Sequence, residues 1–216
     1  MESSGRAKSS LLITVMIYSV AFGVSGLEHG FFELLQGSTR PEGLLISAIG
    51  PADRFWSKGT ETAFTLIPHM GLTGSVAMAF GAGVILWSVL ALRRKHAWIV
   101  LLVLSVGQFL TGGGFAQIFL SIPTSILACR IGAPLSWWKS HLSERTRRYV
   151  AAPWSWLYWG FVVLFALAIE SAVFGLPFGN TQPDLMYRIM TILSYMMLAV
   201  FALSVPSALA KESLET

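Results

Sequence analysis

Long apolar blocks constrain this chain more than any other feature of its sequence. They occupy roughly residues 11 to 35, 63 to 92, 97 to 129, 154 to 176 and 185 to 210, and each is bounded by charges, proline or glycine. A block of about 18 or more apolar residues is long enough to cross the hydrocarbon core of a bilayer. Only 12% of the 216 residues are charged, whereas about 25% is typical of soluble domains. The sequence therefore predicts an all-α integral membrane protein that crosses the membrane several times.

The third block decides how many times the chain crosses. Gly112, Gly113 and Gly114 interrupt it, and consecutive glycines favour a tight turn over a helix interior. Each arm then has about 16 residues, or roughly 24 Å of helix. We predict a short helical hairpin and six spans in all, at about 11–35, 63–92, 97–111, 115–130, 154–176 and 185–210. The alternative is five spans, with one long third helix that keeps the glycines inside it.

Basic residues indicate the direction of the six spans. Eleven of the fifteen Lys and Arg residues fall on the side of the two termini, which the positive-inside tendency assigns to the cytoplasm. All the tryptophans except Trp56 lie at the same boundary, where indole rings favour lipid headgroups. We predict cytoplasmic termini and an outer loop at 37–62. We also predict a basic interfacial segment at 131–152 that contacts anionic inner-leaflet lipid, with an ordinary basic loop as the alternative.

The N-terminal segment has some features of a signal peptide. Arg6 and Lys8 precede the apolar run, and the small residues Ser25 and Gly26 within the run resemble a cleavage site. The apolar run continues to Leu35, so we expect an uncleaved first span. The lone Cys129 excludes an internal disulfide and a cysteine metal site. The net charge of +4 comes from basic residues beside apolar segments, so we expect no nucleic-acid partner.

Strongly polar residues inside the apolar blocks all fall at one predicted depth, in the outer leaflet. Charged groups in hydrocarbon are costly, and a functional role is the default hypothesis for them. We therefore expect an outward-facing pocket of Glu, His and Arg side chains that binds a ligand or an ion. The candidate residues are Glu28, His29, Glu33, His69, Gln108, Gln117, Glu170 and Arg188.

Helical spacing indicates which faces turn toward this pocket. Residues three or four apart share a face of a helix, and four of the six spans carry a polar stripe. We expect the stripes to turn inward and meet. They consist of Tyr18, Phe22, Ser25, His29 and Glu33 in the first span, Thr65, His69 and Thr73 in the second, Gln117, Ser121 and Thr124 in the fourth, and Arg188, Thr191 and Tyr195 in the sixth.

Three classes of function remain open at this point. The pocket can bind or transport a small ligand, an ion or a lipid headgroup. Alternatively, His29, Glu33, His69 and Glu170 can hold a divalent metal, or His29 and His69 a haem. In the third class the protein is an accessory subunit of a homo-oligomer or larger membrane complex, and Glu170 or Glu33 pairs with Arg188 only to fix helix packing. The sequence contains no H-E-x-x-H, G-x-S-x-G or P-loop motif that would name a reaction.

Three short motifs carry a resemblance to a known group of proteins. They are E-H-G-F-F-E-L-L-Q-G at 28–37, I-S-A-I-G-P at 46–51 and G-G-G-F at 112–115. Over residues 18 to 134 the chain resembles a group of small bacterial multi-pass membrane proteins with no assigned activity. The resemblance implies a location in the bacterial inner membrane, and it implies no substrate or mechanism.

Overall fold

The structure is a computed structural model that describes residues 9–215, and it is built almost entirely from helices. A two-stranded antiparallel sheet and one turn of 3₁₀ helix, Pro51–Asp53, interrupt the helices. The helices are α1 (Ser10–Leu35), α2 (Met70–Leu90), α3 (Ala97–Leu110), α4 (Ile118–Ala128), α5 (Ser136–His141), α6 (Glu144–Ala151), α7 (Trp154–Phe174) and α8 (Pro183–Glu215), and the strands are β1 (Leu45–Ser47) and β2 (Thr62–Phe64).

Four stretches of the described chain are helical, long and apolar enough to cross a membrane. They are α1, α2, the 31-residue stretch that contains α6 and α7, and α8. Helices α3 and α4 are shorter, with 14 and 11 residues, and the segment that holds Gly112–Gly114 separates them. The all-helical fold class is confirmed and is compatible with a membrane location. The number of spans and the side on which the termini lie stay predictions.

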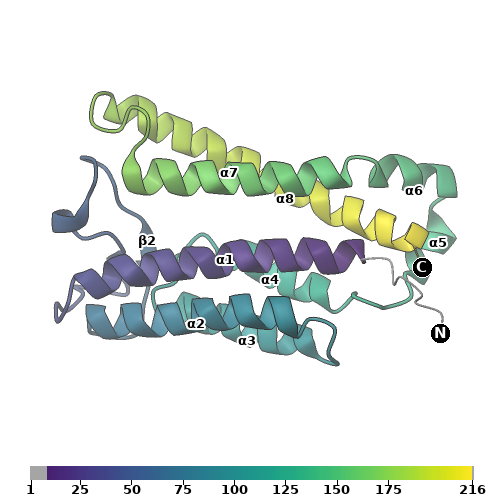
Figure 1. Ribbon diagram of the computed structural model, residues 1–216, viewed down its shortest axis with the longest axis horizontal. Helices are drawn as coiled ribbons and strands as arrows, with labels where there is room; N and C mark the ends of the chain where they lie inside the picture. The colour runs from purple at the N-terminus through teal and green to yellow at the C-terminus, as the bar shows by residue number, and fades with distance from the viewer. Residues whose placement is uncertain (1–8, 216) are drawn as a thin grey trace, which may run out of the picture.

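The long helices run side by side and form two groups around α1 (Figure 1). Helices α2, α3 and α4 pack with α1 into a four-helix body, while α7 and α8 form a pair on the other side of α1. The beginning of α1 and the end of α8 lie together at what we call the terminal end of the bundle. The opposite end, which holds the α1–α2 and α7–α8 connections, is called the loop end.

Aromatic and polar contacts join the two groups near the terminal end. The Tyr18 ring lies 4.2 Å from that of Phe161 on α7, and its hydroxyl donates a hydrogen bond to Ser204 on α8. The Glu212 carboxylate of α8 accepts hydrogen bonds from the Ser10 hydroxyl at 3.1 Å and from the Leu11 backbone N–H at 3.1 Å. An anionic group is favourable at a helix N-terminus, so Glu212 also caps α1.

The connection between α1 and α2 joins the two groups again at the loop end. The Trp56 side chain is buried, and its indole N–H donates to the Ala172 carbonyl of α7 at 3.0 Å. Lys58 forms an ion pair with Asp184 at the start of α8. The α1–α2 connection is therefore a strap that crosses from the four-helix body to the α7–α8 pair.

The second long helix starts later than the predicted boundary at residue 63. Residues 62–64 form β2 instead, and α2 begins at Met70. Pro68 disfavours helical geometry in the residue before it, and the His69 side chain caps the helix by accepting the Leu72 N–H at 3.2 Å.

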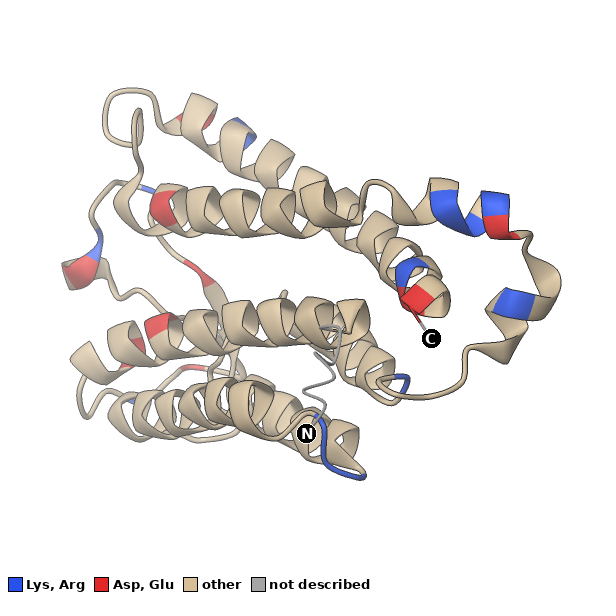
Figure 2. Ribbon diagram, turned by 45° about the vertical axis from the view of Figure 1, so that its right-hand side comes forward, with Lys and Arg blue, Asp and Glu red and all other residues tan. Residues whose placement is uncertain are grey.

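Charge separates between the two ends of the bundle (Figure 2). Most of the Lys and Arg positions lie at the terminal end, in the α2–α3 turn and in the segment of α5 and α6. Arg6 and Lys8, which contribute to the predicted orientation, lie outside the described residues. Among the described residues, the excess of Lys and Arg at the terminal end therefore comes mainly from the segments that connect the long helices.

Helices α1 and α2 approach each other at glycines, and this contact has no room for a side chain. A Cβ at Gly74 would lie 2.5 Å from the Leu34 backbone nitrogen and 3.1 Å from the Glu33 carbonyl carbon. We predict that Gly74→Ala lowers the free energy of unfolding by about 1–3 kcal/mol, because backbone cannot move aside as a flexible side chain can. Thermal unfolding in mild detergent measures the change.

The matched control for this prediction is Gly83→Ala on the same helix. A Cβ there meets only the mobile end of Leu104, at 3.3 Å. Alanine has the higher helix propensity, so the control is expected to be neutral or stabilising by up to about 1 kcal/mol. Equal effects of the two substitutions would contradict a backbone contact at Gly74.

Candidate functional site

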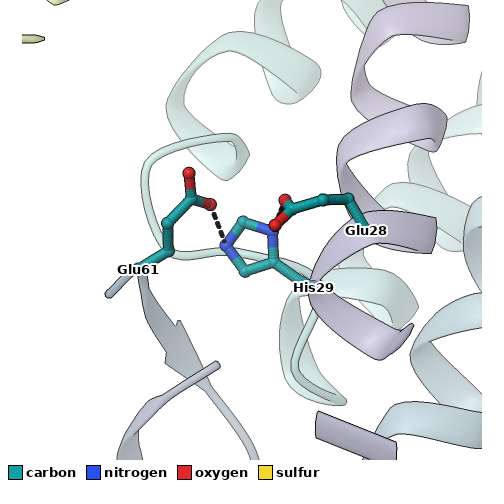
Figure 3. Close-up of side chains that lie close together, drawn as sticks. All are labelled: Glu28, His29 and Glu61. Atoms are coloured by element: carbon teal, nitrogen blue, oxygen red, sulfur yellow. Dashed lines mark ion pairs between the residues drawn. The ribbon is translucent and has the colours of Figure 1, made fainter. Parts of the chain in front are cut away.

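A buried histidine between two carboxylates forms the centre of the candidate site (Figure 3). Glu28 and His29 are neighbours on α1, and Glu61 directly precedes β2. His29 Nδ1 lies 3.0 Å from Glu28 Oε2, and His29 Nε2 lies 2.8 Å from Glu61 Oε2. The three side chains thus join residues more than thirty positions apart in the sequence.

The proton positions on His29 follow from its neighbours. Nδ1 lies 2.9 Å from the Ser25 carbonyl oxygen, which only accepts hydrogen bonds, so Nδ1 carries a hydrogen. Nε2 faces the Glu61 carboxylate, which also accepts. The ring is 3% exposed, and a charged imidazole in such a place needs compensating charge. Glu61 supplies that charge at Nε2, and the Glu28 carboxyl group lies at the opposite edge of the ring.

Backbone pairing on both sides holds Glu61 in place. Its carbonyl accepts the Ala48 N–H at 2.8 Å, next to the register in which Ile46 of β1 opposes Ala63 of β2. On the other edge of β2, the Thr62 carbonyl accepts the Phe115 N–H at 3.0 Å. Glu61 is therefore carried over α1 by a strand that is paired on both edges.

Burial and charge act in opposite directions on Glu61. Burial alone would raise the pKa of its carboxyl group, but the charge of His29 and the hydrogen bond with its imidazole outweigh burial and lower the pKa below the usual 4.5. Glu61 is therefore ionised at neutral pH and acts as the counter-ion of His29.

A cavity of about 520 Å³ opens beside this cluster, between α1 and α4 of the four-helix body and the α7–α8 pair. This volume is within the range of small-molecule sites, about 300–1,000 Å³. One end is polar and includes Ser25, His29, Glu61, Thr62 and Gln117. The remaining walls are largely apolar. They are formed by Phe22 of α1, Phe115, Ala116 and Leu120 in or before α4, Phe165, Ala168, Ile169 and Ala172 of α7, and Tyr187, Met190, Ser194 and Met197 of α8.

The glycine segment 112–114 supports this end of the cavity from behind. The space that a Cβ would fill is taken at Gly112 by the Glu33 carboxylate, at Gly113 by the Gln108 side chain and at Gly114 by the Gln117 amide. Gln108 Nε2 donates to the Phe22 carbonyl at 2.8 Å, and Gln117 Nε2 donates to the Ser25 hydroxyl. The three glycines therefore make room for three polar side chains.

The structure gathers five of the eight predicted site residues in this region and leaves three outside it. Glu28, His29 and Gln117 lie at the site, Gln108 lies behind it, and Glu33 is fully buried against Gly112. The other three, His69, Glu170 and Arg188, are exposed, and His69 caps α2. The ion pairs of the described residues do not include Glu170 with Arg188 or Glu33 with Arg188.

The predicted stripes have different outcomes. All five residues of the first stripe, Tyr18 to Glu33, are buried, so that prediction is confirmed. The stripe of Arg188, Thr191 and Tyr195 is exposed, so the prediction for the last helix is wrong. The face of α8 that lines the cavity is Tyr187, Met190, Ser194 and Met197, about 100° around the helix. Packing against α7, and not the polar stripe, determines which face of α8 turns toward the cavity.

Sequence reasoning missed Glu61. It lies in a connection without helical periodicity, so no spacing rule brings it next to His29. The available signal was one acid directly before Thr62–Phe64, a short run of residues that favour strands. Nothing in the sequence indicates which helix such a strand covers.

The predicted metal and haem ligands are not assembled as a set. Within the described part of the chain, Glu28, His29 and Glu61 are the group of at least three His, Cys, Asp or Glu residues whose ligand atoms lie within 4.8 Å of one another. His29 belongs to this group, and Glu33, His69 and Glu170 do not. In the arrangement seen here the two carboxylates contact different nitrogens of the ring (Figure 3), which suits an ion-pair chain better than one shared ion.

Comparisons with protein-family models, with curated proteins and with solved structures found no match to this chain.

The ionised form of Glu61 stabilises the fold, so stability depends on pH. A carboxyl group whose pKa is lower in the folded state contributes stability above its unfolded pKa, and this stability is lost as the pH falls through the folded pKa. We predict that Glu61→Gln destabilises the protein at about pH 6 by roughly 1–3 kcal/mol and has a smaller effect below about pH 4. Thermal unfolding across this pH range measures both quantities.

Asp184→Asn is the control for this prediction. It makes the same change from acid to amide in the exposed ion pair with Lys58. An exposed pair contributes about 1 kcal/mol or less, so a small effect is expected. A Glu61→Gln effect that is the same at both pH values would show that the ionised carboxylate is not what stabilises the site.

Proposed function

We propose that this protein is a multi-pass membrane protein that binds a small molecule in the cavity beside His29 and Glu61. One observation carries the proposal. The cavity combines largely apolar walls with one polar end, and the polar end contains a buried imidazole already engaged on both nitrogens. Such a site binds an apolar or amphipathic molecule and orients it by one polar head.

The charges at the polar end select the kind of head. The lining contains Glu61 and His29 and no Lys or Arg. Glu61 uses one oxygen for His29, and its second oxygen points away from the ring (Figure 3). A hydroxyl or ammonium head can donate to that oxygen, whereas a carboxylate or phosphate head would meet a like charge, and both nitrogens of His29 are already engaged. The ligand is therefore a hydrogen-bond donor or a cation.

The orientation of the protein is part of the same proposal. The positive-inside tendency assigns the terminal end to the cytoplasm, so the polar end of the cavity faces the outer side of the membrane. The resemblance of residues 18 to 134 favours a bacterial inner membrane. At the terminal end, exposed Trp137 and Tyr149 accompany the basic residues of α5 and α6, which supports contact with anionic lipid.

Three single-chain compounds of equal length test the binding site: dodecylamine, dodecanol and dodecanoate. We predict that the purified protein binds the amine and the alcohol and binds dodecanoate much more weakly. Glu61→Gln is expected to weaken binding of the amine about 10-fold to 100-fold, the cost of losing a hydrogen bond to a charged group. Native mass spectrometry of the protein released from mild detergent measures the bound fraction.

Asp184→Asn again supplies the control, because this exposed acid forms an ion pair outside the cavity. Its affinity for dodecylamine should equal that of the unmodified chain. Equal binding of all three compounds, or an unchanged affinity after Glu61→Gln, would refute the proposed site.

A metal at the same cluster is the second candidate. Glu28, His29 and Glu61 offer one nitrogen and two carboxylate ligands, a set that suits zinc, manganese or iron. The Ser25 carbonyl that accepts from Nδ1 would then orient the ring, as such partners do in metal sites. Elemental analysis separates the two candidates: stoichiometric metal that disappears in both Glu61→Gln and His29→Ala supports the second.

A further inference from the structure

The cavity has four helical walls, and the packing between them is uneven. Helix α1 packs against α4 and against α7, and α7 packs against α8. Helices α4 and α8 both line the cavity, but they do not form one of the substantial helix packings of the described chain. Three of the four corners are therefore closed by helix packing, and the corner between α4 and α8 is the least packed.

The two ends of the cavity are closed by other contacts. Toward the terminal end, Tyr18 packs between Phe161 and Phe201, whose rings lie 4.2 Å and 5.0 Å from it. Toward the loop end, the strap crosses the bundle and is anchored by Trp56 on α7 and by Lys58 on α8. A molecule that approaches along the bundle axis meets one of these contacts, so the α4–α8 corner is the least obstructed route.

The surface around this corner is apolar. Phe119 of α4 is 64% exposed, and Tyr195 and Leu198 of α8 are 69% and 45% exposed. Helix α4 carries no charged residue, and α8 carries none between Arg188 and Lys211. Large apolar side chains exposed on a long apolar helix suit contact with lipid chains. The corner therefore opens toward hydrocarbon.

From these observations we infer that the ligand enters sideways from the bilayer, between α4 and α8, and is a lipid-soluble amphiphile. This inference rests on the proposed binding function and adds its route and its substrate class. The apolar tail lies along Leu120, Met190 and Met197, and the donor head reaches Glu61. Molecules that approach from water at the loop end meet the strap, which is attached to α7 and α8.

Closing the corner tests the route. In a Cys129→Ser background, Phe119→Cys on α4 and Tyr195→Cys on α8 are joined by a bifunctional thiol reagent, with the protein in lipid nanodiscs. We expect joining the helices to slow both binding and release of dodecylamine about 10-fold or more, because the gap must widen for passage. Each single cysteine treated with the same reagent is the control, and mass spectrometry confirms the cross-link.

A steric version needs no reagent and covers the case in which the cross-link does not form. Ser194→Trp narrows the corner from the α8 side, because Ser194 lines the cavity. Ile192→Trp on the same helix adds bulk at an exposed position outside the lining, about 200° around the helix from Met190 and Ser194. We expect slower binding of dodecylamine in Ser194→Trp and an unchanged rate in Ile192→Trp.

The results separate the route from the binding function. If dodecylamine binds and Glu61→Gln weakens it, but the rates stay unchanged in the cross-linked and Ser194→Trp proteins, the lateral route is wrong and the binding site stands. If the unmodified chain binds no amine or alcohol, the proposed function itself fails. Slower binding and release of dodecylamine in the cross-linked and Ser194→Trp proteins, with unchanged rates in their controls, supports the lateral route.

Discussion

The contact between His29 and Glu61 organises the loop end of this protein. A buried charged imidazole is costly without compensating charge, and of its two carboxyl partners only Glu28 comes from its own helix. Glu61 comes from a separate segment, directly before β2. The pairing of β2 with β1 and with the glycine segment, and the attachment of the strap to α7 and α8, all follow the path that brings Glu61 over α1.

Two groups of helices joined at both ends explain why a cavity exists between them. Near the terminal end Tyr18 and Glu212 hold α1 against α8, and near the loop end Trp56 holds the strap against α7. Between these attachments, α4 and α8 form no substantial packing within the described chain. The cavity is thus a consequence of where the contacts are placed, and its polar end coincides with the attachment that carries Glu61.

Helical periodicity predicted the parts of the site that lie within one helix. The stripe from Tyr18 to Glu33 is buried as expected, because a period of 3.6 residues fixes one face of α1. Helical periodicity does not predict contacts between distant segments. Glu61 reaches His29 through strand pairing, and the cavity face of α8 is set by packing on α7. Polarity alone suggested Glu170 and Arg188 for the site, but both lie on exposed faces.

The three glycines at 112–114 have a consequence beyond the turn they form. At each of these positions, a residue from another place in the chain fills the space that a side chain would occupy. These residues are Glu33, Gln108 and Gln117. The packing of residues 112–114 and the packing of these three side chains therefore depend on each other. A shorter neighbour would still not admit a side chain, because Gly112 and Gly114 have φ of +105° and +98° and a Cβ at Gly113 would also lie 2.7 Å from the Gln108 carbonyl oxygen, so the backbone itself requires glycine at all three positions.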